Sequence, residues 1–186
     1  MRAWSSARFT IPLPPGHRFP IEKYAAVRDA VRARGRIAID EPDRMERWAL
    51  SLVHTSRYAD ALLGCTLSAA EIRRIGLPCT PALGERSLRT AQGTVEAAAD
   101  ALGSGAGINL AGGTHHAFPD HGEGFCCFND VALAIRGLQR EGRIRRAAIV
   151  DLDVHQGNGT AAIFAGDPDV FTFSMHGAGN FPFRRE

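Results

Sequence analysis

Long hydrophobic runs are absent from this 186-residue sequence, in which no stretch approaches the roughly 20 apolar residues that span a bilayer. The opening MRAWSSARFTIPLPPG also lacks the apolar block of a secretory signal. Cysteine is scarce, and the four cysteines form no C-x-x-C pair, so a disulfide framework is not expected. We therefore expect a cytoplasmic protein that has no membrane partner.

An excess of charge of one sign is also missing. The chain has 22 basic and 20 acidic residues, a net charge of +2, which argues against direct nucleic-acid binding through bulk charge. The composition that remains is ordinary for a globular protein, with 45% hydrophobic and 23% charged residues, and it suits a single domain with a buried core. Composition does not indicate the oligomeric state.

The order of apolar patterns along the chain predicts an α/β fold. The opening as far as Pro20 is expected to be extended chain. Three short apolar runs, residues 108–111, 147–152 and 170–175, predict strands. Strands that alternate with helices imply a parallel sheet with helices on its faces, and so one α/β domain over residues 1–186. Helices are predicted over residues 21–33, 56–64, 68–75, 85–102, 129–141 and 160–165, with a weaker candidate over 42–53.

Each predicted strand is followed by unusual polar residues. The first leads into GGTHH, the second into DLDVHQGNG, and the third into Ser174, Met175 and His176. Because ligands bind beyond the carboxyl ends of parallel strands, these three segments are expected to meet at one site.

The DLDVHQGNG segment indicates a metal site. If the chain stays extended past Val150, period-two geometry places Asp151, Asp153 and His155 on one side. Two carboxylates and an imidazole repel one another unless a cation lies among them, and oxygen with nitrogen donors suits zinc. The alternative is that the aspartates cap loops and His155 is a hydrogen-bonded core histidine. The glycines at 157 and 159 are expected to form a tight turn before a helix starting near Thr160.

The adjacent histidines, His115 and His116, are candidates for proton transfer. An imidazole beside a metal-activated water can take its proton, and a second imidazole can pass a proton to a leaving amine. Read alone, such a pair is also common on surface loops. Asn158 is interpreted as part of a turn and helix cap. Phe125 and Phe181 would usually belong to the core, although Phe125 lies near the histidines in sequence and could line a pocket.

Taken together, GGTHHAFPDHGEGFCCFNDVALAI, VDLDVHQGNGTAAIF and FTFSMHGAGNFP resemble the histone deacetylase family. With PLPPGHRFP near the start, the sequence is most similar to the class IV-like deacetylases of bacteria. This resemblance covers the chain from Pro12 to Glu186. The resemblance implies the three-layer α/β/α sandwich of the arginase/deacetylase superfamily, with a mainly parallel sheet. It also implies hydrolysis of the amide of acetyl-lysine, in a protein or a small acylated amine, with one zinc ion as cofactor.

The resemblance also implies roles for individual residues. Asp153 and His155 would be zinc ligands, and His115 and His116 the catalytic histidines. Asp151 and Asn158 would support the first and the second histidine, respectively. The walls of an acyl-lysine channel would be Gly124, Phe125 and Phe181. A monovalent-cation site, usually for potassium, would be formed by the backbone around Asp151, Asp153, His155, Ser174 and Met175.

The chain departs from the family pattern in length. Family members continue past FPFRRE, and their second zinc-binding aspartate and oxyanion-stabilising tyrosine come later. We therefore expect the N-terminal part of a catalytic domain, incomplete at its C-terminal side, with a missing third zinc ligand and impaired activity. An inactive fragment that binds an acyl ligand is one alternative. A ureohydrolase or other metal amidohydrolase is another, although Gly157 stands where ureohydrolases place a further aspartate.

Overall fold

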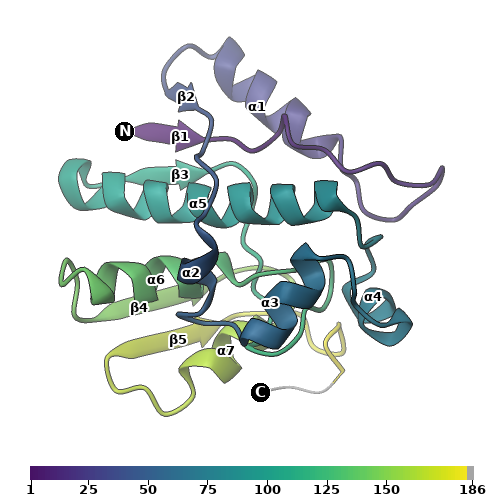
Figure 1. Cartoon of the computed structure of the whole chain (residues 1–186). Coiled ribbons are helices and arrows are strands. Elements are labelled where there is room, and N and C mark those ends of the chain that lie inside the picture. The colour runs from purple at the N-terminus through teal and green to yellow at the C-terminus, as the bar shows by residue number, and fades with distance from the viewer. Residues whose placement is uncertain (184–186) are drawn as a thin grey trace.

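The strands form two parallel sheets in a computed structural model that describes residues 1–183 (Figure 1). The first sheet has the order β2-β1-β3, in which β1 (Arg2–Trp4) pairs with β2 (Ala38–Asp40) and with β3 (Gly107–Asn109). The second pairs β4 (Ala147–Asp151) with β5 (Val170–Ser174). The prediction of an α/β fold with parallel strands is confirmed.

The helices lie between the strands in the order that the sequence predicts. The longest, α5, contacts β1, β3 and α6, and the two helices α5 and α6 lie side by side along the direction of the strands (Figure 1). Among residues 1–183, every helix is too short or too polar to cross a membrane. The helices are α1 (Lys23–Ala33), α2 (Arg47–Leu50), α3 (Ser56–Leu63), α4 (Ala69–Ile75), α5 (Pro81–Ser104), α6 (Asp130–Arg140) and α7 (Asn158–Phe164).

Local sequence signals explain several helix ends. Ser68 accepts a hydrogen bond from the backbone of Glu71, whose carboxylate accepts one from the backbone of Ser68, so the predicted capping box starts α4. Thr80 caps α5, which has a proline in its first turn and ends in a left-handed Gly105. The start of α5 is therefore earlier than predicted, since Pro81 is compatible with a first turn.

Two short strands and one helix differ from the sequence prediction. Residues 2–4, expected as part of an extended opening, form β1 in the middle of the first sheet, and β2 was not predicted. The helix predicted over 42–53 is reduced to α2. Strands of three residues leave too little periodicity to detect. The strand predicted over 108–111 ends earlier, because Oδ1 of Asn109 accepts a hydrogen bond from the backbone of Ala111 and turns the chain.

The buried core explains which faces of the strands are covered. One cluster joins Tyr58, Leu62, Leu88 and Phe128, and the hydroxyl of Tyr58 donates to the carbonyl of Cys127 over 2.7 Å. A second cluster packs α6 and α7 on one face of β4 and β5. The opposite face of this sheet is apolar and open within residues 1–183: the exposed fractions are 62% for Val150, 64% for Phe171 and 46% for Phe173.

Candidate active site

The loop that carries the two histidines follows β3 and is fixed by a buried carboxylate. Asp130, at the start of α6, is 1% exposed, and its Oδ1 accepts a hydrogen bond from the backbone of Thr114 over 2.7 Å. The hydroxyl of Thr94 on α5 donates to the other oxygen of Asp130. Sequence reasoning missed Asp130, whose only signal was its place directly after Asn129, the residue that caps α6.

His115 is bound to a carboxylate at the end of β4. Its Nδ1 lies 2.6 Å from Oδ2 of Asp151, and the two side chains are only 14% and 16% exposed. Burial by itself would raise the pKa of Asp151, but hydrogen bonds from His115 and from the backbone of Asp153 lower that pKa overall. Asp151 is therefore ionised and favours a proton on Nδ1 of His115.

His116 is bound to a neutral amide instead. Its Nδ1 donates to Oδ1 of Asn158 over 2.7 Å, which leaves Nε2 as the unprotonated nitrogen of the neutral ring. Burial, followed by the nearby His115, lowers the pKa of His116 to about 4. The centroids of the two histidine rings are 4.0 Å apart. The pair therefore presents a neutral imidazole next to one that is polarised by a carboxylate.

Asp153 and His155 are gathered by turns rather than by a continuous strand. The backbone of Asp153 donates to Oδ1 of Asp151 over 3.0 Å, and the backbone of His155 donates to Oδ1 of Asp153 over 2.8 Å. The strand ends at Asp151, so the period-two explanation of this segment is wrong. Aspartate side chains that bond the backbone two residues ahead bend the chain, yet they bring the same donors together.

Asp153 and His155 are the residues that could hold a metal ion here. Their side chains are 50% and 42% exposed, and Nδ1 of His155 lies 3.1 Å from Oδ1 of Asp153. A carboxylate and an imidazole are donor types that zinc takes, but catalytic zinc usually has three protein ligands. No group of three or more such donors with metal-site geometry exists within residues 1–183. The donor chemistry fits zinc, and the described part of the chain supplies two ligands.

The two glycines of the DLDVHQGNG segment are required because neighbouring groups lie too close for a side chain. A Cβ atom on Gly157 would lie 2.4 Å from Oδ2 of Asp151, and one on Gly159 would lie 2.4 Å from the carbonyl oxygen of Ala117. Gly157 is the central residue of a tight turn, with φ −74° and ψ 63°, and the backbone of Asn158 donates to the carbonyl of Gln156 over 2.8 Å, so the predicted turn is confirmed. α7 begins at Asn158, earlier than predicted, and Gly157 rather than Asn158 is its N-cap.

Two of the three predicted channel residues lie against the histidines. A Cβ atom on Gly124 would lie 2.8 Å from Cδ2 of His116, and the edge of the Phe181 ring meets His116 with 4.9 Å between centroids. Phe125 packs elsewhere, with its ring centroid 5.2 Å from that of Phe19 and 6.2 Å from that of His17.

The residues predicted for a monovalent cation are only partly brought together. Asp151 and Ser174 are paired in register at the ends of β4 and β5, and the backbone of Met175 donates to the carbonyl of Asp151 over 3.0 Å. The hydroxyl of Ser174 lies 2.9 Å from Nδ1 of His176. Asp153 and His155 follow in the adjoining turns, where both side chains are half-exposed.

Two further histidines, His54 and His121, have other partners. His54 is 3% exposed and lies 3.0 Å from the carbonyl of Phe118. His121 stacks on Phe118 and pairs with Asp120.

Comparisons with known proteins place this geometry in a family. Residues 17–186 match the histone deacetylase domain. The chain is 45% identical over 181 residues to an uncharacterized protein of Picosynechococcus sp., covering 96% of this chain and 60% of that protein. It is 38% identical over 145 residues to the acetoin utilization protein AcuC of Bacillus subtilis, covering 72% of this chain and 37% of that protein.

A solved structure has the same fold. The crystal structure of an HDAC homolog from Aquifex aeolicus superposes with a TM-score of 0.84 at 25% sequence identity, covering 98% of this chain and 53% of that chain. The chain thus spans 60% of the Picosynechococcus protein and 53% of the Aquifex aeolicus homolog. The domain match over residues 17–186, the shared arginase/deacetylase fold and the sequence identity to its relatives show that the chain belongs to the histone deacetylase family.

Proposed function

We propose that this chain carries the catalytic histidines and part of the metal site of a zinc-dependent deacetylase. The reaction is hydrolysis of the amide of acetyl-lysine, or of a related acylated amine, to acetate and a free amine. The observation that carries the proposal is the difference between two adjacent histidines, of which His115 is held by the Asp151 carboxylate and His116 by the Asn158 amide. Such a pair can take a proton on one ring and stabilise positive charge on the other.

His116 is suited to be the general base. Its low pKa keeps the ring neutral near pH 7, and its Nε2 is free to accept a proton from an attacking water. His115 is suited to be the electrostatic partner, because Asp151 stabilises positive charge on its ring. A proton held on either ring can then pass to the leaving amine, which would otherwise depart as an unstable anion.

Asp153 and His155 are the residues that would hold the zinc ion. When bound, zinc would supply Lewis-acid activation of the amide carbonyl and of water. A third ligand has to come from outside the described residues, so we expect the 186-residue chain alone to bind zinc weakly and to be impaired. The backbone around Asp151 and Ser174 is the proposed position of a potassium ion.

The substrate would approach along Gly124 and Phe181. Gly124 has no side chain, and the ring of Phe181 packs against that of His116, so these two residues border the proposed base and would suit the methylene stem of an acylated lysine. Phe125 is the third proposed wall residue of the channel, and its ring packs on that of Phe19.

The test is acetate release from an acetyl-lysine peptide with zinc present, measured for the 186-residue chain and for the longest protein that its gene encodes. We expect release that is lost in His116→Ala and Asp153→Ala variants that keep the wild-type circular dichroism spectrum. Saturable peptide binding without acetate would favour an acyl-ligand-binding protein. Urea release that depends on manganese would favour a ureohydrolase and contradict the proposal.

A further inference from the structure

Cys65 stands in a backbone position that glycine normally takes. It follows Gly64, the residue that caps the end of α3, and its φ angle is 55°. The backbone N–H of Cys65 donates to the carbonyl of Leu62 over 3.3 Å. That of Thr66 donates to the carbonyl of Ala61 over 2.8 Å. Glycine usually ends a helix in this motif, because a side chain strains the left-handed backbone, so a cysteine here calls for a reason.

Cys79 brings a second thiol to the same place. It directly precedes Thr80, which caps α5, and its Sγ donates to the carbonyl of Leu62 over 3.8 Å. The carbonyl oxygen of Leu62 therefore accepts from the thiol of Cys79 and from the backbone N–H of Cys65. The two thiol groups also lie within hydrogen-bond reach of each other. Two cysteines from separate segments thus meet at the end of α3.

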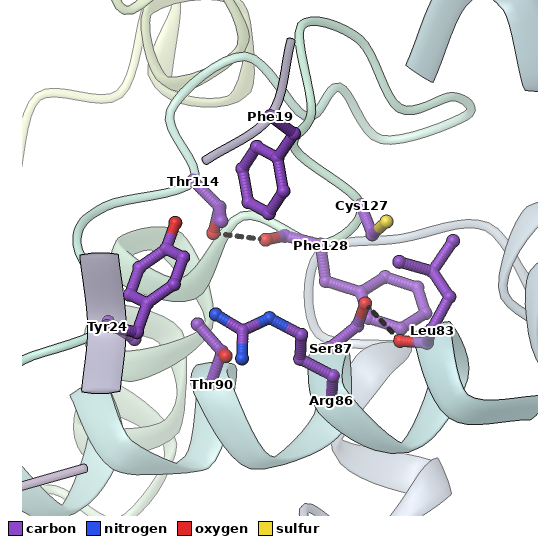
Figure 2. Close-up of a pocket in the computed structure, with 10 residues that line it drawn as sticks. Phe19, Tyr24, Leu83, Arg86, Ser87, Thr90, Thr114, Cys127 and Phe128 are labelled. Carbon is purple, nitrogen blue, oxygen red and sulfur yellow. Dashed lines mark hydrogen bonds between the residues drawn. The ribbon is translucent and has the colours of Figure 1, made fainter. Parts of the chain in front are cut away.

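The other two cysteines are shielded from solvent. Cys126 is 6% exposed and Cys127 is 3% exposed. Figure 2 shows Cys127 beside Phe128 at the wall of a small cavity. Burial raises the pKa of the Cys127 thiol to about 12 and also raises that of Cys126. Cys65 and Cys79 are only partly buried, and both neighbours of Cys65 in the chain are exposed, so an oxidant from solution meets this pair first.

We propose that Cys65 and Cys79 form a modification site, at which hydrogen peroxide produces a reversible disulfide. Peroxide oxidises the Sγ of Cys65 to a sulfenic acid and is reduced to water. The sulfur of Cys79 then attacks that of Cys65: the S–S bond forms, the S–O bond breaks, and the oxygen leaves as a second water. Two thiols and one peroxide thus give one disulfide and two waters, and a dithiol reverses the reaction.

The order of the two steps follows from burial. Cys79 packs against the main core cluster, and burial, followed by the nearby Cys65, raises the pKa of its thiol. It is therefore the slower of the two to react with peroxide and serves as the second thiol. A single bond of this kind is a transient redox sensor, in contrast to a structural disulfide framework.

The disulfide closes a loop that contains α4, in the segment that joins α3 to α5 (Figure 1). The carbonyl of Arg74 accepts the backbone N–H of Gly124 over 3.2 Å. The next carbonyl, of Ile75, accepts that of Phe125 over 2.8 Å. A Cβ atom on Gly76 would lie 3.0 Å from the Phe125 ring, so the contact is tight. A cross-link at the base of the loop limits its opening and so steadies this backbone, whether or not the chain is a deacetylase.

The test is peptide mapping of the longest protein that the gene encodes, first reduced and then treated with hydrogen peroxide. Trypsin leaves Cys65 in residues 58–73, Cys79 in residues 75–86, and the two buried cysteines together in residues 90–136. We expect the first two peptides to be joined by a bond that dithiothreitol breaks. The disulfide should raise the melting temperature by about 5–10 °C and slow amide hydrogen exchange at Phe125 at least about threefold.

Cys65→Gly is the most informative variant, because glycine suits the left-handed position and keeps the reduced protein stable. This variant and Cys79→Ser should lose both the linked peptides and the rise in melting temperature. Cys127→Ala, at a buried cysteine, should keep both. Three results in the wild type would each overturn the proposal: separate peptides after peroxide treatment, a link to residues 90–136 instead, or equal melting temperatures and equal exchange at Phe125 in the reduced and oxidised forms.

Discussion

Nδ1 of His115 lies 2.6 Å from Oδ2 of Asp151, and a second histidine of the chain has the same contact at the same distance. In that second pair, Nδ1 of His121 lies 2.6 Å from Oδ1 of Asp120. The difference is burial: the Asp151 side chain is 16% exposed and that of Asp120 is 67% exposed. A hydrogen bond shielded from water is stronger than an exposed one, so the buried carboxylate holds its imidazole more firmly in place.

The two pairs give a matched test of the His115–Asp151 contact. Asp151→Asn keeps the shape but removes the charge that stabilises a protonated His115, so we expect kcat for acetyl-lysine hydrolysis to fall about 10²–10⁴-fold. Asp120→Asn should leave kcat unchanged. Steady-state kinetics of both variants decides this, and an equal loss in the two, or none in Asp151→Asn, would contradict the proposed role of Asp151.

Gly157→Ala should damage the site while leaving the fold intact. The added methyl group would lie 2.4 Å from Oδ2 of Asp151 and 3.3 Å from Nδ1 of His115, so it must displace the Asp151 carboxylate from its contact with His115. We expect at least about a tenfold loss of kcat, since small displacements of catalytic groups are costly. Gly137→Ala on α6 is the control, because its Cβ meets nothing within 4 Å. This variant should gain about 0.5–1 kcal/mol of stability, as measured by urea unfolding, and keep full activity.

His54 should make the stability of the chain depend on pH. Its Nε2 accepts the backbone N–H of Asn129 over 3.0 Å, and its Nδ1 lies 3.0 Å from the carbonyl of Phe118, which fixes the neutral ring. Burial lowers its pKa to about 4 in the folded chain, from 6.5 as an ordinary histidine. Between these two pH values the unfolded chain binds the extra proton, so stability is complete above pH 6.5 and is lost as the pH falls toward 4.

The size of this effect can be measured with His54→Leu. The wild type should lose up to about 3 kcal/mol of unfolding free energy through His54 between pH 6.5 and 4. The variant should be less stable at pH 7 by about 1–3 kcal/mol, because it leaves the backbone groups of Asn129 and Phe118 unpaired. The unfolding free energy of the variant should fall less steeply than that of the wild type as the pH is lowered from 6.5 to 4. Parallel curves for the two proteins in urea unfolding would show that His54 does not cause the pH dependence.

The meeting of the histidine loop with the end of β4 was predictable from sequence. Polar residues that follow parallel strands gather at one edge, and the contacts of His115 with Asp151 and of His116 with Asn158 lie there. The path of the chain between Asp151 and His155 was not predictable. A strand that continued past Asp151 and two successive aspartate turns would both bring the same donor side chains together, and the structure has the turns. Only backbone hydrogen bonds distinguish these two arrangements.

Other features depend on packing between distant segments. Gly157 forms the turn that the sequence predicts, but the close approach of Asp151, which leaves no room for a side chain there, comes from another element. The role of Asp130 is similar, because it depends on a contact with Thr114, which lies on a different segment of the chain. Residue type and spacing carry no signal for such contacts. The sequence could therefore identify His115 and His116 as the candidate catalytic pair, but not the packing contacts that hold the site in place.

Removal of metal tests the central claim most directly. The longest protein that the gene encodes is treated with a chelator, dialysed, and assayed for acetate release from an acetyl-lysine peptide as zinc is added back. The account predicts no release after chelation, recovery with zinc, and recovery in Asp153→Asn only at zinc concentrations more than about tenfold higher. Full acetate release from the metal-free protein, or identical zinc titrations for the wild type and Asp153→Asn, would contradict it.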